Sequence, residues 1–446
     1  MPRGLPSIAT IGFDGILSPM LTISRRIHRF VGLKPSRATW LASMAILCPL
    51  WCEVGASEQW NQWRGPSRDG LVRGSQWPES INTNHLQLRW RVELGPSYSS
   101  PIFWGDRTYT TETLNKKSEV VKCFDLPSGK LLWTQSWEGS VSVPFFAKSN
   151  GDWIRSTPST DGERVYVGGM RDVVVCLEAA TGKVLWRYDF VQELHSAVPD
   201  FGMVCSPLVE GDSVYVQAGG GVACLDRMTG QLRWRALQDG GGMNGSAFSS
   251  PVMAEILGHR QILVQGREKL SGLNPVDGTV LWSQPVEAFR GMNILTPIVY
   301  RDQLFTSTYG GKTTLYQLVK DQDRWAVSNR WSLKAQGYMS SPVIIGDVAY
   351  HHLKSERFTA IHLKTGAELW TTEESFGKYM SEVAQNDRIL ALDQRGWLYL
   401  IRANPEKYDL IEKRRLTESD TWAHLAVGDH LLLVRELKAL VAYDWN

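Results

Sequence analysis

The sequence has 446 residues, 43% of them hydrophobic, with 48 Lys and Arg against 46 Asp and Glu. This is the composition of a globular protein, and the near balance of charge gives no support to nucleic-acid binding. After residue 60, no stretch is long and apolar enough to span a bilayer as a helix.

The first 56 residues have the pattern of a secretory signal peptide. Basic residues are concentrated at 24–37, an apolar stretch follows at 38–51, and small residues at 54–56 suit a signal peptidase. We therefore predict that residues 1–56 are removed after Ala56 and that the mature chain is exported, periplasmic or secreted. The signal holds six of the basic and two of the acidic residues, so the mature chain is close to neutral.

Two features of this signal leave alternatives open. Residues 1–19 fit no region of a signal peptide, which makes Met20 an alternative start to Met1. Arg25-Arg26 resembles a twin-arginine signal, but His28 stands where a bulky apolar residue is usual. The general and the twin-arginine export routes therefore both stay open.

Residues 57–85 form an aromatic, turn-rich segment. Trp60 and Trp63 stand near its start, and Arg-Gly-Pro follows directly. We expect the segment to pack on the domain that follows, with its tryptophans in surface grooves. A binding site built on Trp60 and Trp63 is the alternative.

From residue 86 onward the chain repeats one pattern. In the copy at 224–234 apolar residues alternate, Asp226 begins a turn, Gly230 ends it, and Trp234 follows. Five copies keep Gly four residues after the polar position and Trp four residues after Gly, and this fixed spacing indicates a repeat protein. The tryptophans of these copies are Trp133, Trp186, Trp234, Trp282 and Trp370.

A Ser/Thr-Pro step precedes each unit, and a short strand, a polar turn and a second strand follow it. One unit is therefore four short strands. Two degenerate units begin at Tyr379 and near Trp422 and bring the number of units to eight. The steps are Ser100-Pro101, Thr157-Pro158, Ser206-Pro207, Ser250-Pro251, Thr296-Pro297 and Ser341-Pro342.

The last unit has only three strands, ending at 440–445, while the strand at 86–91 precedes the first unit and carries Trp90 at the expected place. A ring that joins these ends leaves no sheet edge open. We therefore predict an all-β fold for 86–446: an eight-bladed β-propeller of four-stranded antiparallel blades, closed by an N-terminal strand that completes the last blade.

The repeat resembles the tryptophan-docking motif of the pyrroloquinoline-quinone (PQQ) repeat β-propellers, and the resemblance covers 86–446. The opening Trp-x-x-Trp-Arg-Gly-Pro is similar to that of exported bacterial members with no assigned reaction. The resemblance implies that each motif tryptophan docks on the neighbouring blade, and burial of a large ring with one N–H donor agrees with this role. The tryptophans concerned are Trp90, Trp133, Trp186, Trp234, Trp282, Trp331 and Trp370.

The resemblance implies two functional branches. Quinoprotein dehydrogenases of the family bind PQQ and Ca²⁺, and many place an adjacent Cys-Cys disulfide against the cofactor, which this chain lacks. The other branch includes the propeller lipoprotein of the outer-membrane β-barrel assembly machine, a scaffold without cofactor. A shared fold does not decide between them.

The mature chain has no motif for a nucleophile, a P-loop or a zinc hydrolase. We therefore expect no catalytic residue, no metal site and no cofactor, with PQQ and Ca²⁺ as the alternative. We also expect free, buried thiols at Cys123, Cys176, Cys205 and Cys224.

Cations and amides are expected to gather around the central opening, because the turns after each second strand and the inter-blade loops share one face. They predict a site for an anionic ligand. The candidate ligand-binding residues are Arg155, Asn244, Arg267, Arg290, Asn293, Lys312 and Arg395.

We interpret the protein as an exported, monomeric, non-catalytic scaffold or binding protein of the bacterial cell envelope, with a protein or an anionic ligand as its partner. One alternative is a PQQ-dependent dehydrogenase that oxidises alcohols or sugars. The other is a sugar- or peptide-binding module that uses Tyr98, Phe201, Phe248 and Tyr338.

Overall fold

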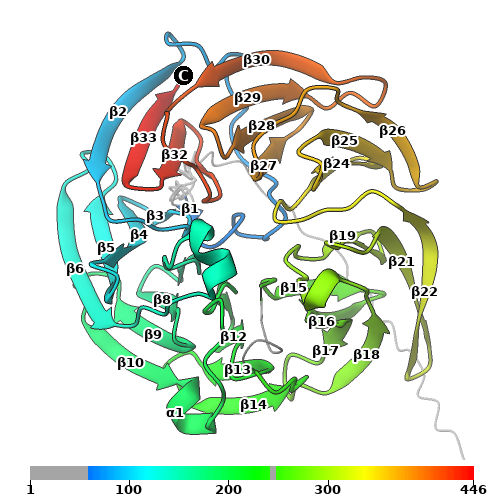
Figure 1. Ribbon diagram of the computed structural model, residues 1–446, viewed down its shortest axis with the longest axis horizontal. Coiled ribbons are helices and arrows are strands. Elements are labelled where there is room, and N and C mark those ends of the chain that lie inside the picture. The colour runs from blue at the N-terminus through cyan, green and yellow to red at the C-terminus, as the bar shows by residue number, and fades with distance from the viewer. Residues whose placement is uncertain (1–58, 242–247) are drawn as a thin grey trace, which may run out of the picture. The chain divides into compact units, whose positions relative to one another are not determined.

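The computed structural model describes residues 59–241 and 248–446, so the predicted signal peptide lies outside the described residues. The described chain forms eight antiparallel sheets arranged as the blades of a ring (Figure 1). The first strand of each blade lies nearest the centre and the fourth at the rim. This confirms the predicted all-β, eight-bladed propeller.

Each blade follows the strand order that the repeat predicts. In blades 1 to 4 the strands are β3 (Ile102–Trp104), β4 (Arg107–Leu114), β5 (Ser118–Asp125) and β6 (Leu131–Glu138); β7 (Ser159–Thr160), β8 (Arg164–Gly169), β9 (Val173–Glu178) and β10 (Val184–Asp189); β11 (Leu208–Glu210), β12 (Ser213–Gln217), β13 (Val222–Asp226) and β14 (Leu232–Ala236); β15 (Val252–Ile256), β16 (His259–Gln265), β17 (Lys269–Leu273) and β18 (Val280–Pro285).

The remaining blades come from the second half of the chain, with one strand from its start. In blades 5 to 8 the strands are β19 (Ile298–Tyr300), β20 (Gln303–Ser307), β21 (Thr313–Asp321) and β22 (Arg324–Leu333); β23 (Val343–Ile345), β24 (Val348–His352), β25 (Phe358–His362) and β26 (Ala367–Thr371); β27 (Met380–Gln385), β28 (Arg388–Asp393), β29 (Trp397–Arg402) and β30 (Asp409–Arg415); β31 (Ala426–Val427), β32 (Leu431–Glu436), β33 (Ala439–Trp445) and β2 (Leu86–Glu93).

The ring closes in the predicted way. β2 pairs antiparallel with β33, with Leu86 opposite Trp445, so the outermost strand of blade 8 comes from the start of the domain. Blade 1 has a further strand that the repeat does not predict: β1 (Gln59–Trp60) pairs with β3 on its inner edge. Both additions satisfy backbone groups that an open edge would leave unpaired.

The motif tryptophans connect neighbouring blades. Trp234 in blade 3 donates its indole N–H to Pro275 O of blade 4 at 3.2 Å. Its ring lies against Gly278, where an added Cβ would come within 2.5 Å of the ring. The same donation links Trp90 to Leu126 O, Trp133 to Ala179 O, Trp186 to Arg227 O, Trp331 to Leu363 O and Trp370 to Asn404 O.

Trp282 departs from this pattern. Its N–H donates to Gln261 Oε1 within its own blade at 2.6 Å. Blade 5 offers no docking glycine, because β21 and β22 form a longer hairpin with Gln322 and Asp323 at its tip. Trp282 still packs in the apolar cluster that contains Tyr316 of blade 5. The ring contact is therefore kept while the inter-blade hydrogen bond is lost.

The helices are short: η1 (Phe145–Asn150), α1 (Phe190–Leu194) and η2 (Phe289–Gly291). Among the described residues, none of these has the length and apolar character to cross a bilayer. Each follows the last strand of a blade, so the helices belong to inter-blade connections. The thiols are free and buried, as predicted, at Cys123, Cys176, Cys205 and Cys224.

Candidate functional site

Hydrogen bonds link five of the six Ser/Thr-Pro steps in succession around the centre of the propeller. Proline fixes its own φ and keeps the residue before it extended, so these steps leave the strand ladder and face the centre. The N–H of the Ser or Thr in one blade donates to the hydroxyl of the corresponding residue in the next. The bonds run from Ser100 to Thr157 (3.1 Å), Thr157 to Ser206 (3.0 Å), Ser206 to Ser250 (2.9 Å) and Ser250 to Thr296 (3.1 Å), and His424 N donates to Ser100 (2.7 Å).

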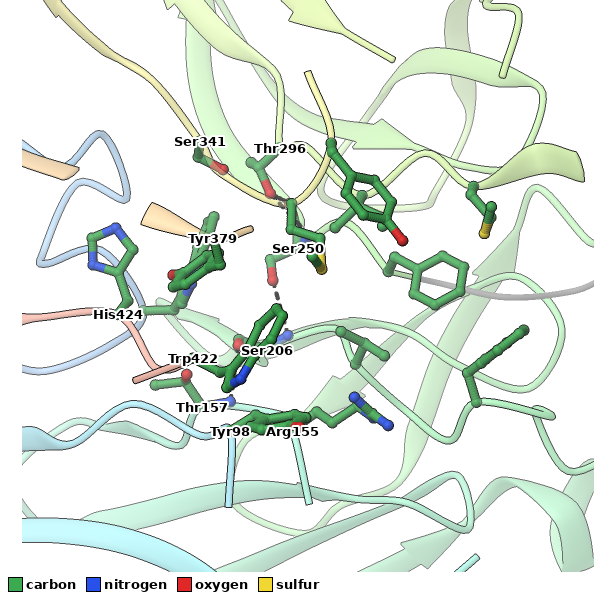
Figure 2. Close-up of a pocket in the computed structure, with 18 of the residues that line it drawn as sticks. Tyr98, Arg155, Thr157, Ser206, Ser250, Thr296, Ser341, Tyr379, Trp422 and His424 are labelled. Atoms are coloured by element: carbon green, nitrogen blue, oxygen red, sulfur yellow. Dashed lines mark hydrogen bonds between the residues drawn. The ribbon is translucent and has the colours of Figure 1, made fainter. Parts of the chain in front are cut away.

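We call Ser100, Thr157, Ser206, Ser250 and Thr296 the hydroxyl ring. Figure 2 shows Ser206, Ser250 and Thr296 in succession, joined by dashed hydrogen bonds. In a buried region away from the ladder, these hydroxyls satisfy backbone N–H groups that would otherwise lack a partner. The repeated Ser/Thr therefore has a structural reason at the five positions of the hydroxyl ring.

Residues 60–70, which we call the plug, run across the centre of the ring (Figure 1). Trp60 is only 2% exposed and belongs to the hydrophobic core, so the expectation of a surface groove is wrong for it. Gly65 makes this possible: its φ is 83°, and an added Cβ would lie 2.9 Å from the Trp60 ring. A left-handed glycine lets the chain turn back tightly over the indole.

Arg68 anchors the plug to blades 3 and 4. Its buried guanidinium donates to Gln62 Oε1 (2.9 Å), Ser206 O (3.1 Å) and Pro251 O (2.9 Å), and also to Pro207 O. These carbonyls lie where proline interrupts the ladder. Burial lowers the pKa of Arg68 to about 9, so the group stays charged at neutral pH.

Arg64 anchors the plug to blade 6. It donates to Asp69 O (2.8 Å) and to Pro342 O (2.6 Å). Burial lowers the pKa of Arg64 to about 10, and the nearby Glu382 carboxyl opposes that shift. Burial likewise raises the pKa of Glu382 well above its usual range. Both arginines are sealed from solvent, so the plug closes the centre of the ring.

Above the plug lies a cavity of about 740 Å³, which we call the funnel. Trp63, His424 and the hydroxyl ring contribute to its lining. The inter-blade connections converge here, because each of them leads into the first strand of the next blade near the centre of the ring. The outer hairpin of blade 5 does not reach the lining. The funnel is thus a cup with the plug beneath it, not an open channel.

One wall of the funnel is a stack of rings. Tyr379 and Trp422 are stacked with centroids 6.1 Å apart and an interplanar angle of 19°. Tyr98 follows at 5.6 Å from Trp422, and the Arg155 guanidinium lies over Tyr98 at 5.2 Å (Figure 2). We call these four residues the Tyr98 wall. Such a surface offers flat apolar area next to a cation.

Further aromatic residues line the funnel from the inter-blade connections. Phe201 is 6.2 Å from Phe146 and 5.6 Å from Phe248, between ring centroids. Phe289 and Tyr338 also belong to the lining. Phe146 is 53% exposed and Phe289 47% exposed, although both are large and apolar. An exposed apolar patch around a concave site is typical of a binding surface.

The polar groups of the lining are cationic or neutral. Arg155, Arg267 and Arg290 line the funnel, and within the described residues no Asp or Glu does. Arg155 donates to Gly151 O at 2.7 Å and makes no ion pair within 4.0 Å among the described residues. Burial lowers the pKa of Arg155, and Tyr98 and the Asp152 carboxyl oppose the shift. The funnel therefore presents a desolvated positive charge beside an aromatic wall.

His424 is the titratable group of the floor. Its Nδ1 faces Leu425 O at 3.2 Å, and its Nε2 has no hydrogen-bond partner in the described chain. Burial lowers the pKa of His424 to about 3, and Arg64 lowers it further. The imidazole is therefore neutral at physiological pH and offers Nε2 as an acceptor.

The structure divides the candidate ligand-binding residues that the sequence indicates. Arg155, Arg267 and Arg290 meet at the funnel. Asn293 is buried, and its amide donates to Gly266 O (3.0 Å) and Arg267 O (2.8 Å), so it holds the turn that carries Arg267. The other candidates stand apart: Lys312 is exposed outside the lining, Arg395 pairs with Asp393 at 2.9 Å, and Asn244 lies outside the described residues.

The aromatic residues of the peptide- or sugar-binding alternative all reach the funnel: Tyr98, Phe201, Phe248 and Tyr338. Trp422 and His424 were not expected there. Their position in the repeat could have indicated them, since His424 stands where the Ser/Thr-Pro steps have Ser or Thr. Arg64 and Arg68 were also missed, although the neighbouring Gly65 and Gly70 indicate a tight turn.

The described lining of the funnel does not have the donor set for the Ca²⁺ that accompanies PQQ in the dehydrogenases. Ca²⁺ takes about six to eight oxygen ligands, with carboxylates prominent among them. The described lining offers hydroxyls, phenols, guanidinium groups and one imidazole. No group of three or more His, Cys, Asp or Glu in the described chain could hold a metal ion. The residues present favour an anionic ligand over a cation.

Comparison with known proteins finds one matching family model and several similar proteins. A family model described as outer membrane protein assembly factor BamB matches residues 117–372. BamB of Yersinia pestis is 25% identical over 342 residues, which cover 71% of this chain and 81% of the relative. A polyvinylalcohol dehydrogenase of Sphingopyxis sp. (strain 113P3) is 23% identical over 199 residues, covering 41% of this chain and 29% of the relative.

Among solved structures, BamB from Moraxella catarrhalis superposes with a TM-score of 0.60 at 17% identity, covering 80% of this chain and 99% of that one. At this identity the likeness supports the propeller fold alone. The family model, in contrast, spans more than half of the chain and includes the docking tryptophans from Trp133 to Trp370. The chain therefore belongs to the family of outer membrane protein assembly factor BamB.

Proposed function

We propose that this protein is an exported, non-catalytic binding protein of the bacterial cell envelope and that its partner, a protein, docks in the funnel. The observation that carries the proposal is a cup of about 740 Å³ with aromatic walls and a hydrogen-bonding floor. Ligand sites commonly have volumes of roughly 300–1,000 Å³, apolar walls and a few placed polar groups. Membership of the BamB family supports a protein partner and a place in the envelope.

The chemistry of the floor favours binding over catalysis. His424 is the lining residue best suited to move a proton, but its low pKa, about 3, makes it a weak base. A nucleophile needs a base within hydrogen-bond reach. The hydroxyl of Ser100 instead accepts the backbone N–H of His424 at 2.7 Å. The remaining hydroxyls of the ring likewise accept backbone N–H groups.

The charge of the lining supports an acidic or otherwise anionic partner. Arg155, Arg267 and Arg290 converge on a concave surface whose described lining contains no carboxylate. A cleft lined by one sign of charge focuses its potential even when the whole protein is nearly neutral. The exposed rings of Phe146 and Phe289 at the same site supply apolar area for contact.

Site-specific photo-crosslinking tests this proposal. A photoreactive amino acid replaces Phe289 at the funnel, and in a matched protein it replaces Leu131 on the outer strand β6. The two side chains are equally exposed, at 47% and 48%. Irradiation of intact cells should give discrete protein adducts from position 289 and none from 131. Adducts from position 131 alone, or the same adducts from both, would contradict docking in the funnel.

A further inference from the structure

The hydroxyl ring has unused donors. Ser100, Thr157, Ser206 and Ser250 each accept one backbone N–H, and none of these four hydroxyls donates to an acceptor in the described chain. A hydroxyl can donate once in addition to accepting. All four line the funnel. Their O–H groups therefore form an arc of donors at the bottom of the cup.

A cation stands beside this arc. Arg155 lies two residues before Thr157 in sequence, lines the same cavity and is held over Tyr98 at 5.2 Å. Its Nε is buried without a hydrogen-bond partner in the described residues. Several hydroxyl donors and one guanidinium, with no carboxylate in the described lining, match a carboxylate group. A cationic or purely apolar ligand would leave these hydroxyl and guanidinium donors without partners.

The shape of the site selects the end of a chain. Arg64 and Arg68 are 1% and 3% exposed beneath the funnel, so a polypeptide cannot pass through the ring. A chain end can enter the cup and reach the donors at the bottom, and of the two ends the carboxyl end carries the matching charge. The phenol group of Tyr338 in the lining would hydrogen-bond a peptide backbone, whereas an acyl chain would leave it unpaired.

We propose that the funnel captures the C-terminal end of a partner protein, with the terminal carboxylate on the hydroxyl ring and Arg155 and with apolar or aromatic final side chains against the Tyr98 wall. This inference rests on the proposed function and specifies which part of the partner enters the site. Capture of a terminal carboxylate is a known mode of peptide recognition. Here a ring of side-chain hydroxyls takes the place of backbone amides.

The test uses the mature protein and two fluorescent tetrapeptides of sequence Ala-Tyr-Val-Phe, one with a free carboxylate and one amidated. Fluorescence anisotropy should show the acid binding at least tenfold more tightly than the amide, because hydrogen bonds to a charged group are the stronger ones. Dodecanoate serves as the acyl-chain probe and should not displace the peptide at equal concentration.

Variants locate the effect. Arg155→Met should bring the affinity for the acid close to that for the amide and leave the affinity for the amide unchanged, while Arg155→Lys should restore part of the difference. Lys312→Met, at an exposed cation outside the lining, is the matched control and should bind as the wild type does. Thermal melting of each variant checks that it is folded.

The outcomes separate this inference from the proposed function. Equal binding of acid and amide would overturn capture of the carboxylate while leaving the funnel as a peptide site. Displacement by dodecanoate as effective as by the peptide would overturn the choice of a chain end over a lipid. Absence of peptide binding together with crosslinks from position 289 would also overturn the inference, and absence of both would overturn the proposed function as well.

Discussion

Substitution of Gly278 by alanine tests how the blades are joined. Gly278 has a φ of 75°, and an added Cβ would lie 2.5 Å from the Trp234 ring, which therefore has to move. The left-handed backbone costs an alanine roughly 1–2 kcal/mol. Displacement of the ring and weakening of its bond to Pro275 O add about 1–3 kcal/mol of overpacking. We expect a total loss of about 2–5 kcal/mol in the free energy of unfolding.

Gly258, in the same blade, supplies the control. Its φ is 73°, but an added Cβ would meet nothing within 4 Å. Gly258→Ala should therefore cost only the backbone term of roughly 1–2 kcal/mol. In a Trp234→Ala background, Gly278→Ala should fall to the same cost, because the clash is gone.

Urea unfolding of the four proteins in this double-mutant cycle measures the coupling between Trp234 and Gly278. We expect a coupling energy of about 1–3 kcal/mol, the range for residues in direct contact. If Gly278→Ala costs the same with and without Trp234, the tryptophan does not dock on the glycine and the account of inter-blade contacts is wrong.

Arg68→Met should lower the free energy of unfolding in a urea titration by about 3 kcal/mol or more, because buried carbonyls of two blades lose their donor. Arg73→Met is the control: its side chain is 61% exposed, and the same titration should show a change of less than about 1 kcal/mol. Burial raises the pKa of Asp172 to about 7. The native state therefore keeps a proton that the unfolded chain releases near pH 4, so wild-type stability should fall relative to Asp172→Asn by about 1.4 kcal/mol per pH unit from pH 4 to 7. If the difference in stability between the wild type and Asp172→Asn does not change with pH in that range, the raised pKa of Asp172 is wrong. Deletion of residues 57–92 removes the plug and β2, and size-exclusion chromatography should find the shortened chain aggregated; a monomer that melts like the mature protein would contradict ring closure.

The fold could be predicted from the sequence because its information is local and repeated. The spacing from Asp226 to Gly230 to Trp234 identifies a strand, a turn and a docking residue within one short stretch. Five such stretches, within a series of eight four-stranded units, leave few alternatives to a ring. Even the closing strand follows from the same pattern, since Trp90 stands in an otherwise isolated copy.

The plug could not be predicted in this way. Arg68 bonds to carbonyls 138 and 183 residues away, and Arg64 to one 278 residues away. No local pattern reports such partners, and the acceptors are backbone atoms that every residue has. A charged residue in an aromatic, turn-rich segment is ordinarily placed at the surface, because burial of a charge is costly unless it is fully hydrogen-bonded.

The candidate site was only partly predictable for a related reason. Position in the repeat brings Arg155, Arg267 and Arg290 to the central face, and this part of the expectation agrees with the lining. The same rule cannot tell which of the candidate side chains already bond to other groups of the protein. Arg395 bonds to the Asp393 carboxylate two residues away, and Asn293 is consumed by the backbone of a neighbouring turn.

The central claim is that a partner enters the funnel, and a co-crystal structure with the free-acid tetrapeptide tests it most directly. The account predicts density along the Tyr98 wall, with the terminal carboxylate within hydrogen-bond distance of Arg155 and of at least two hydroxyls of the ring. Peptide density on an outer strand such as β6, with the funnel holding only solvent, would contradict it.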